Sequence, residues 1–137
     1  MASRLNPYIS FKDNARQALE FYAEVFGGDL RISTFGEYGS PDEPGADGVM
    51  HGMLETPSGY TIMASDTPAH MEYSPGSSIS VSLSGDDGDE LRDYWDKLTP
   101  GGTVAVPLEK QMWGDEFGMV IDKFGITWMV NVVAAQA

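Results

Sequence analysis

The stretch that decides the fold lies in the last third of the chain, where residues 118–132 read GMVIDKFGITWMVNV. Two apolar runs flank a four-residue turn that ends in a glycine, and this pattern predicts a β-hairpin. Residues 52–63 read GMLETPSGYTIM, and their turn glycine, threonine and methionine are in register with the later stretch at a distance of 66 positions. The sequence therefore indicates a structural unit that occurs twice.

The first half of the chain supplies the rest of one unit. The alternation of apolar and polar residues over 6–11 predicts a half-buried strand, and the apolar spacing over 15–26 predicts an amphipathic helix. A second strand is expected over 30–35 and the first hairpin over 49–65. Residues 36–48 are rich in glycine, proline and acids and have no apolar period, which predicts a long loop.

The second half shows the same order of patterns. Strict alternation of serine with aliphatic residues over 78–84 predicts a strand. The apolar positions from Leu91 to Leu98 predict a helix after the acidic cap at residues 86–87. Residues 103–108 predict another strand, and residues 109–116 predict the loop that leads into the closing hairpin.

Both halves thus predict strand, helix, strand and hairpin, which is an α+β chain with two tandem βαβββ units. We expect a single domain over 1–137, with internal repeats at about 5–66 and 77–133 and a linker over 66–76. A helix would bury one face of each sheet and leave the other exposed. Two such sheets placed side by side would form a curved sheet around a central cleft.

Composition excludes several classes of partner. The chain has 137 residues and carries 21 acidic against 8 basic side chains, a net charge of −13. Such a charge repels phosphate backbones and anionic membranes, so we expect no nucleic acid and no membrane as partner. The absence of cysteine excludes disulfides and thiolate metal sites and fits a reducing compartment. Together with the lack of a long apolar run, this leads us to expect a cytoplasmic protein.

Several segments together carry a family resemblance. They are 7–11 (PYISF), 18–22 (ALEFY) with 25–28 (VFGG), 50–52 (MHG), 113–118 (WGDEFG) and 122–131 (DKFGITWMVN). The chain resembles the vicinal oxygen chelate superfamily of glyoxalase I, bleomycin-resistance proteins and extradiol dioxygenases, and more closely its PhnB-like branch. The resemblance implies the glyoxalase/bleomycin-resistance fold and a homodimer.

The same resemblance implies where a metal would be held. Enzymes of the superfamily bind a divalent ion through His or Glu at the first strand of each unit and Glu in its last strand. Those places look like Asn6, Ser78, Met63 and Met129 in this chain. Thioethers are soft ligands, and an amide or a hydroxyl brings no charge to a hard divalent ion. We therefore expect no metal and no other cofactor.

The alternation of side chains along the strands assigns residues to the cleft. In residues 126–133, Trp128 and Val130 belong to a large apolar set suited to lie under a helix, whereas Met129 belongs to a mixed set. In residues 49–55, Met50, Gly52 and Leu54 are expected to face the helix, and His51, Met53 and Glu55 the cleft. The predicted cleft comprises Asn6, Tyr8, Ser10, His51, Met53, Met63, Ser78, Ser80, Trp113, Met119, Met129 and Asn131.

The methionines at the cleft suit varied apolar ligands, because the thioether side chain is flexible and polarisable. A ligand-free core filled by the same methionines stays open as an alternative. Trp113 is expected to form an aromatic wall of the cleft, with Asp115 as a polar contact, or to pack in the core or at a dimer contact. His51 and Glu55 are the candidate catalytic residues, and a buried structural histidine is the other interpretation.

These observations favour a small-molecule-binding protein of the glyoxalase/bleomycin-resistance fold without the superfamily metal site. The first alternative is a lyase-, isomerase- or dioxygenase-like metalloenzyme with a rearranged site around His51 and Glu55. The second is a non-catalytic interaction module with a filled cleft. No glycine pattern matches a phosphate-binding or dinucleotide-binding loop, since Gly101-Gly102 follows a predicted helix and does not open one.

Overall fold

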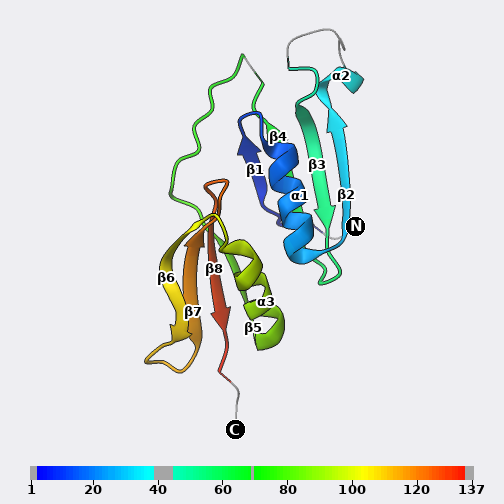
Figure 1. The fold of residues 1–137 in the computed structure, drawn as a ribbon. Coiled ribbons are helices and arrows are strands. Elements are labelled where there is room, and N and C mark those ends of the chain that lie inside the picture. Colours follow the sequence, from blue (N-terminus) through cyan, green and yellow to red (C-terminus); the bar gives the residue numbers. More distant parts are fainter. Residues whose placement is uncertain (1–2, 39–44, 69, 135–137) are drawn as a thin grey trace. The chain divides into compact units, whose positions relative to one another are not determined.

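The computed structural model describes residues 3–38, 45–68 and 70–134, and the chain divides into two compact units, 1–75 and 76–137 (Figure 1). The elements of unit 1 are β1 (Tyr8–Phe11), α1 (Ala15–Phe26), β2 (Asp29–Thr34), α2 (Phe35–Tyr38), β3 (Val49–Glu55) and β4 (Thr61–Asp66). Those of unit 2 are β5 (Val81–Gly85), α3 (Gly88–Leu98), β6 (Thr103–Lys110), β7 (Glu116–Ile121) and β8 (Thr127–Val132). None of the described helices is long and apolar enough to cross a membrane.

Each unit contains one open four-stranded sheet. The strand orders are β1-β4-β3-β2 and β5-β8-β7-β6, so the first strand of each unit pairs with the last. That pairing is parallel in both sheets, and the other pairings are antiparallel. The α+β class and the βαβββ order are confirmed. A duplication of the whole unit and a cleft between the two sheets stay predictions.

Several predicted boundaries are wrong. The strand expected over 78–84 begins only at Val81, and the strand expected from Asn6 begins at Tyr8. The strand expected over 103–108 continues to Lys110. Phe35–Tyr38 is helical, although most of it was assigned to the predicted loop 36–48. Residues 39–44 of that loop and Ala69 of the predicted linker lie outside the described residues.

One helix covers one face of the sheet in each unit. In unit 1, Leu54 and Ala64 are fully buried together with Leu19 and Tyr22 of α1. A side chain at Gly52 would collide with Leu19, so this glycine allows the helix to approach β3. The predicted alternation breaks near the start of β3, where a bulge lies opposite Ser33 and Thr34. There Val49 is fully buried and Met50 is only half-buried.

Unit 2 has an equivalent core. Trp128, Val120 and Val130 of the sheet are buried, and so is Leu98 of α3. A Cβ atom at Gly118 would lie 2.7 Å from the ring of Trp95 on α3. Gly118 therefore lets α3 approach β7 closely, as Gly52 lets α1 approach β3 in unit 1. Because alternate residues of each strand point to this core, the intervening ones point to the opposite face.

The two repeated stretches adopt the same turn. Thr56 N donates to the carbonyl of Tyr60 at 2.9 Å, and Asp122 N donates to the carbonyl of Ile126 at 2.8 Å. The turn glycines, Gly59 and Gly125, have φ values of 88° and 89°, a region that favours glycine. The Asp122 carboxylate is buried and accepts three further hydrogen bonds, from Phe124 N (2.8 Å), Ile126 N (3.1 Å) and Trp128 Nε1 (2.8 Å).

A second buried carboxylate ties the start of the helix to the sheet in unit 1. The Asp66 carboxylate accepts hydrogen bonds from Ala15 N and Val49 N, both at 2.9 Å, and Asp66 is only 5% exposed. Asn14, at the helix cap, makes no side-chain capping bond, so Asp66 satisfies the first amide of α1. The interpretation of Asp66 as the start of a linker is therefore wrong, since it is the last residue of β4.

Replacing Asp66 by Asn is expected to lower the free energy of unfolding by about 1–3 kcal/mol. An amide offers one acceptor oxygen, so one of the two backbone N–H groups would face the NH₂ group. Urea titration monitored by circular dichroism measures the change, with Asp47→Asn as the control because Asp47 is exposed. Equal unfolding midpoints for Asp66→Asn and the wild type would contradict this role.

Candidate functional site: the open faces of the two sheets

The sheet face opposite the helix is called the open face of each unit. In unit 1 the strand register places four side chains directly beside one another across it. Tyr8 pairs with Met63, Met63 with Met53, and Met53 with Arg31. Both methionines are half-buried, and the two outer residues are exposed. An aromatic ring, two thioethers and a guanidinium therefore form a continuous row.

The open face of unit 2 has a more apolar row at the equivalent place. Ser82 pairs with Met129, Met129 with Met119, and Met119 with Val106. Met119 and Met129 are half-buried, whereas their neighbours Val120 and Val130 on the same strands are fully buried under the helix. The structure thus brings together the predicted methionines in two opposing pairs, one on each sheet.

His51 lies on the open face of unit 1 next to Tyr8. The Tyr8 hydroxyl lies 3.5 Å from His51 Nδ1, and the two ring centroids are 5.8 Å apart at an interplanar angle of 33°. Tyr8 is 51% exposed and His51 is half-buried, so the pair lies at the surface of the open face. Glu55, the other candidate catalytic residue, is exposed and pairs with Asp29 and Thr61. It lies four residues from His51 on the same strand, so the two do not form one compact site.

Other predicted cleft residues lie in different environments. Ser10 is exposed on β1, and Asn6 is half-buried before that strand begins. Ser78 and Ser80 are exposed and precede β5. Trp113 is 64% exposed between β6 and β7. The exposure of Trp113 excludes the core position considered for it.

Asn131 is tied to the loop that precedes β7. Its Nδ2 donates to Asp115 Oδ2 at 3.1 Å, and Asp115 Oδ1 accepts from Ala134 N at 2.8 Å. The bond from the Ala134 amide lowers the pKa of Asp115 most, followed by that from Asn131, with a smaller contribution from Trp113. Asp115 therefore fixes the loop to the end of β8.

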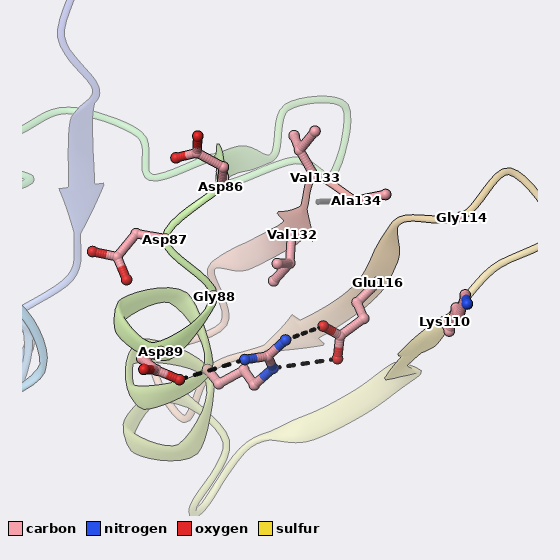
Figure 2. Close-up of a pocket in the computed structure, with 11 residues that line it drawn as sticks. Asp86, Asp87, Gly88, Asp89, Lys110, Gly114, Glu116, Val132, Val133 and Ala134 are labelled. Carbon is pink, nitrogen blue, oxygen red and sulfur yellow. Dashed lines mark hydrogen bonds and ion pairs between the residues drawn. The ribbon is translucent and has the colours of Figure 1, made fainter. Parts of the chain in front are cut away.

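A groove of about 810 Å³ lies at the N-terminal end of α3 and was not foreseen from the sequence (Figure 2). Arg92 on α3 forms a two-bond ion pair with Glu116 on β7, marked by dashed lines, and also lies 3.7 Å from Asp89. The carboxylates of Asp86 and Asp87 point away from Glu116. Arg92 and Glu116 are 24 residues apart, and no spacing rule connects them.

The ion pair shifts the pKa of both partners. The hydrogen bonds from Arg92 lower the pKa of Glu116, and the same bonds raise the pKa of Arg92. The ion pair thus joins α3 to β7 across the groove. The interpretation of Glu116 as a loop residue is wrong, since it begins β7.

The residues at the four positions where the resemblance implies a metal include no hard, charged donor. Met63 and Met129 are half-buried thioethers on the open faces, and Ser78 is exposed outside any strand. Within residues 3–38, 45–68 and 70–134, no three His, Asp or Glu side chains gather in a group that could hold a metal. These side chains offer only soft or uncharged donor atoms, which a hard divalent ion does not favour.

The fold defines the class of protein. A solved structure from Sphaerobacter thermophilus, described as a member of the glyoxalase/bleomycin resistance protein/dioxygenase superfamily, is 18% identical with a TM-score of 0.56. The comparison covers 97% of this chain and 100% of that one. The chain thus has the glyoxalase/bleomycin-resistance fold that the sequence predicted.

The family follows from closer matches. The family model described as 3-demethylubiquinone-9 3-methyltransferase matches residues 3–131, and the chain belongs to this family. Protein YjdN of Escherichia coli K12 is 30% identical, covering 96% of this chain and 97% of the relative. The crystal structure of PA1353 from Pseudomonas aeruginosa is 34% identical, with a TM-score of 0.84 and coverage of 98% and 100%. A Bacillus cereus structure described as a PhnB protein is 24% identical, with a TM-score of 0.71, and the comparison covers 96% of this chain and 100% of that one. The PhnB-like resemblance is therefore confirmed.

Substitution of adjacent residues on β8 distinguishes an open face from a filled core. Met129→Lys is expected to change the free energy of unfolding by less than about 1 kcal/mol, because the lysine stem lies along the face and its charge reaches water. Val130→Lys is expected to cost about 3 kcal/mol or more, because Val130 is fully buried. Equal destabilisation of both variants, measured by urea titration, would show that the methionines fill a core.

The ion pair predicts an acid-sensitive contact in unit 2. Since the folded pKa of Glu116 lies below its ordinary value, its stabilisation is present above about pH 4 and is lost as the pH falls through the folded pKa. Glu116→Gln is expected to flatten the fall in stability below pH 4. Acid titration followed by circular dichroism measures it, with Glu24→Gln as control because Glu24 is an exposed residue of α1. Identical profiles for Glu116→Gln and wild type would refute the assignment.

Proposed function

We propose that this chain is a small-molecule-binding protein that works without a metal and that the open faces of its two sheets bind the ligand. The observation that carries the proposal is the pairing of half-buried methionines, Met53 with Met63 and Met119 with Met129, on the faces left free by the helices. Pairs of flexible, polarisable thioethers offer apolar contact to ligands of different shapes. The lack of hard, charged donors at Asn6, Met63, Ser78 and Met129 supports the proposal that the protein works without a metal.

The proposal includes a homodimer in the cytoplasm. Proteins of this fold often bind small molecules and form dimers. The family description names methyl transfer, but the proposal does not include that reaction. A nucleotide-type cofactor is commonly held by a glycine-rich loop that opens a helix, whereas Gly101 and Gly102 follow α3.

A lyase-, isomerase- or dioxygenase-like reaction centred on His51 is the second candidate function. It is favoured by the Tyr8 contact, which orients the imidazole on an accessible face. General acid–base catalysis requires an oriented group of this kind within reach of a substrate. Under this alternative, His51→Ala would abolish turnover of any substrate found, and a fully active His51→Ala variant would exclude it.

Binding of an uncharged fluorescent probe, phenylnaphthylamine, tests the leading proposal. The wild type is expected to bind it equally well before and after treatment with a chelator. The double variant Met53→Gln and Met63→Gln, which keeps the side-chain length, is expected to weaken binding roughly tenfold through lost apolar contact. Met71→Gln is the control, because Met71 is 56% exposed and lies outside both sheets.

Two results of this titration would refute the proposal. Loss of probe binding on chelation would show that a metal is required. Equal affinity of the wild type, this double variant and the double variant Met119→Gln and Met129→Gln would show that neither open face is the binding surface.

A further inference from the structure

The open face of unit 1 carries a group of polar side chains beside the methionine pair. On the edge strand β2, Arg31 and Ser33 point to the same face, because they are two residues apart. Arg31 lies opposite Met53 and Ser33 lies opposite His51 on β3. Neighbouring strands are about 4.8 Å apart, and residues i and i+2 of a strand about 6.6 Å. The three polar side chains therefore converge on one area of the face.

In one of its two neutral tautomers, His51 presents a hydrogen-bond donor to a ligand. When the Tyr8 hydroxyl donates to Nδ1, a neutral imidazole carries its proton on Nε2. The outer nitrogen of His51 then acts as a donor. Ser33 contributes a hydroxyl donor, and Arg31 contributes a guanidinium whose donors match the oxygens of an oxyanion. In this tautomer of His51, all three groups favour an acceptor-rich, negatively charged partner.

Arg31 is available for such a partner. It is exposed, and in the described part of the chain it has no ion pair. Asp29 and Glu55, which pair with one another in the sheet, lie one row further along the same face. Their carboxylates repel an anion from that side, so an oxyanion at Arg31 is directed toward Ser33 and His51.

We infer that the open face of unit 1 binds the oxyanion of an amphiphilic small molecule between Arg31, Ser33 and His51, with its apolar part over Met53 and Met63. The oxyanion is a carboxylate, sulfonate or phosphate-type group. The inference rests on the proposed function and adds the chemical class of the ligand. It gives Arg31 the role of a specificity-determining residue, because the chain's net charge of −13 otherwise disfavours anions.

Two related probes test the inference. Anilinonaphthalene sulfonate carries an apolar aromatic body and an oxyanion, whereas phenylnaphthylamine has a similar body without the charge. The folded wild type, checked by near-ultraviolet circular dichroism, is expected to bind the sulfonate more tightly. Arg31→Gln is expected to weaken sulfonate binding roughly tenfold and to leave phenylnaphthylamine binding within about twofold. Arg31→Lys, which keeps the charge, is expected to retain most of the sulfonate affinity.

Arg16→Gln is the matched control. Arg16 is an exposed arginine on α1, so the substitution makes the same change of net charge on the opposite side of the sheet from the open face. It is expected to leave sulfonate binding within about twofold. An equal loss in Arg16→Gln and Arg31→Gln would overturn the inference, because only the net charge would then matter.

The remaining outcomes separate this inference from the proposed function. If phenylnaphthylamine binding depends on Met53 and Met63 but sulfonate binding does not depend on Arg31, the inference is wrong and the proposed function stands. If the folded protein binds neither probe, both are wrong. A sulfonate preference that disappears in Arg31→Gln alone supports both.

Discussion

A single helix covers only one face of a four-stranded sheet, and this limit shapes both units of the chain. Leu54 and Ala64 are fully buried under α1, while the alternate residues Met53 and Met63 remain half-buried on the other face. The period of two along a strand makes this division unavoidable. A strand that supplies a core on one side therefore also supplies a surface, and the side chains on that surface decide what the protein binds.

Two buried carboxylates hold the covered faces in place. Asp66 satisfies Ala15 N at the start of α1 and Val49 N at the start of β3. Asp122 satisfies amides of the closing turn and the indole of Trp128, the largest fully buried side chain. Each joins segments that the hydrophobic contacts alone would leave free to slide. Because register decides which side chains reach the open face, these bonds also position the candidate site.

The sequence was sufficient for features that depend on local period. The two hairpins follow from apolar runs on either side of a turn that ends in glycine, and the face assignment of Met129 against Val130 follows from alternation. The structure agrees with both. Alternation was misleading before Val81, where the serine pattern continues but the partner strand does not. β5 pairs with β8 only from Trp128 onward. Two residues before Trp128, the carbonyl of Ile126 accepts a hydrogen bond from Asp122 N in the turn of the hairpin. A strand needs a partner as well as a pattern.

Contacts between distant residues could not be foreseen in the same way. Arg92 and Glu116 lie 24 residues apart, and Asp66 lies 51 residues from Ala15. Such pairs have no periodic signal, because they depend on which elements become neighbours in the sheet. Arg31 was missed for a related reason, since its importance appears only when the register sets it opposite Met53. The methionines and His51 were visible in the sequence, but Arg31 and Ser33 beside them were not.

The open faces of the two units differ in chemistry although their backbones match. At the places where unit 1 has Arg31 opposite Met53, unit 2 has Val106 opposite Met119. His51 precedes Gly52 in the first hairpin, and Phe117 precedes the equivalent Gly118 in the second. At these two places unit 1 thus presents a guanidinium and an imidazole, whereas unit 2 presents an aliphatic side chain and a phenyl ring. An amphiphilic organic ligand needs polar groups at one end only, and the open face of unit 1 has Arg31 and His51 beside its methionine pair, which supports the proposed ligand class.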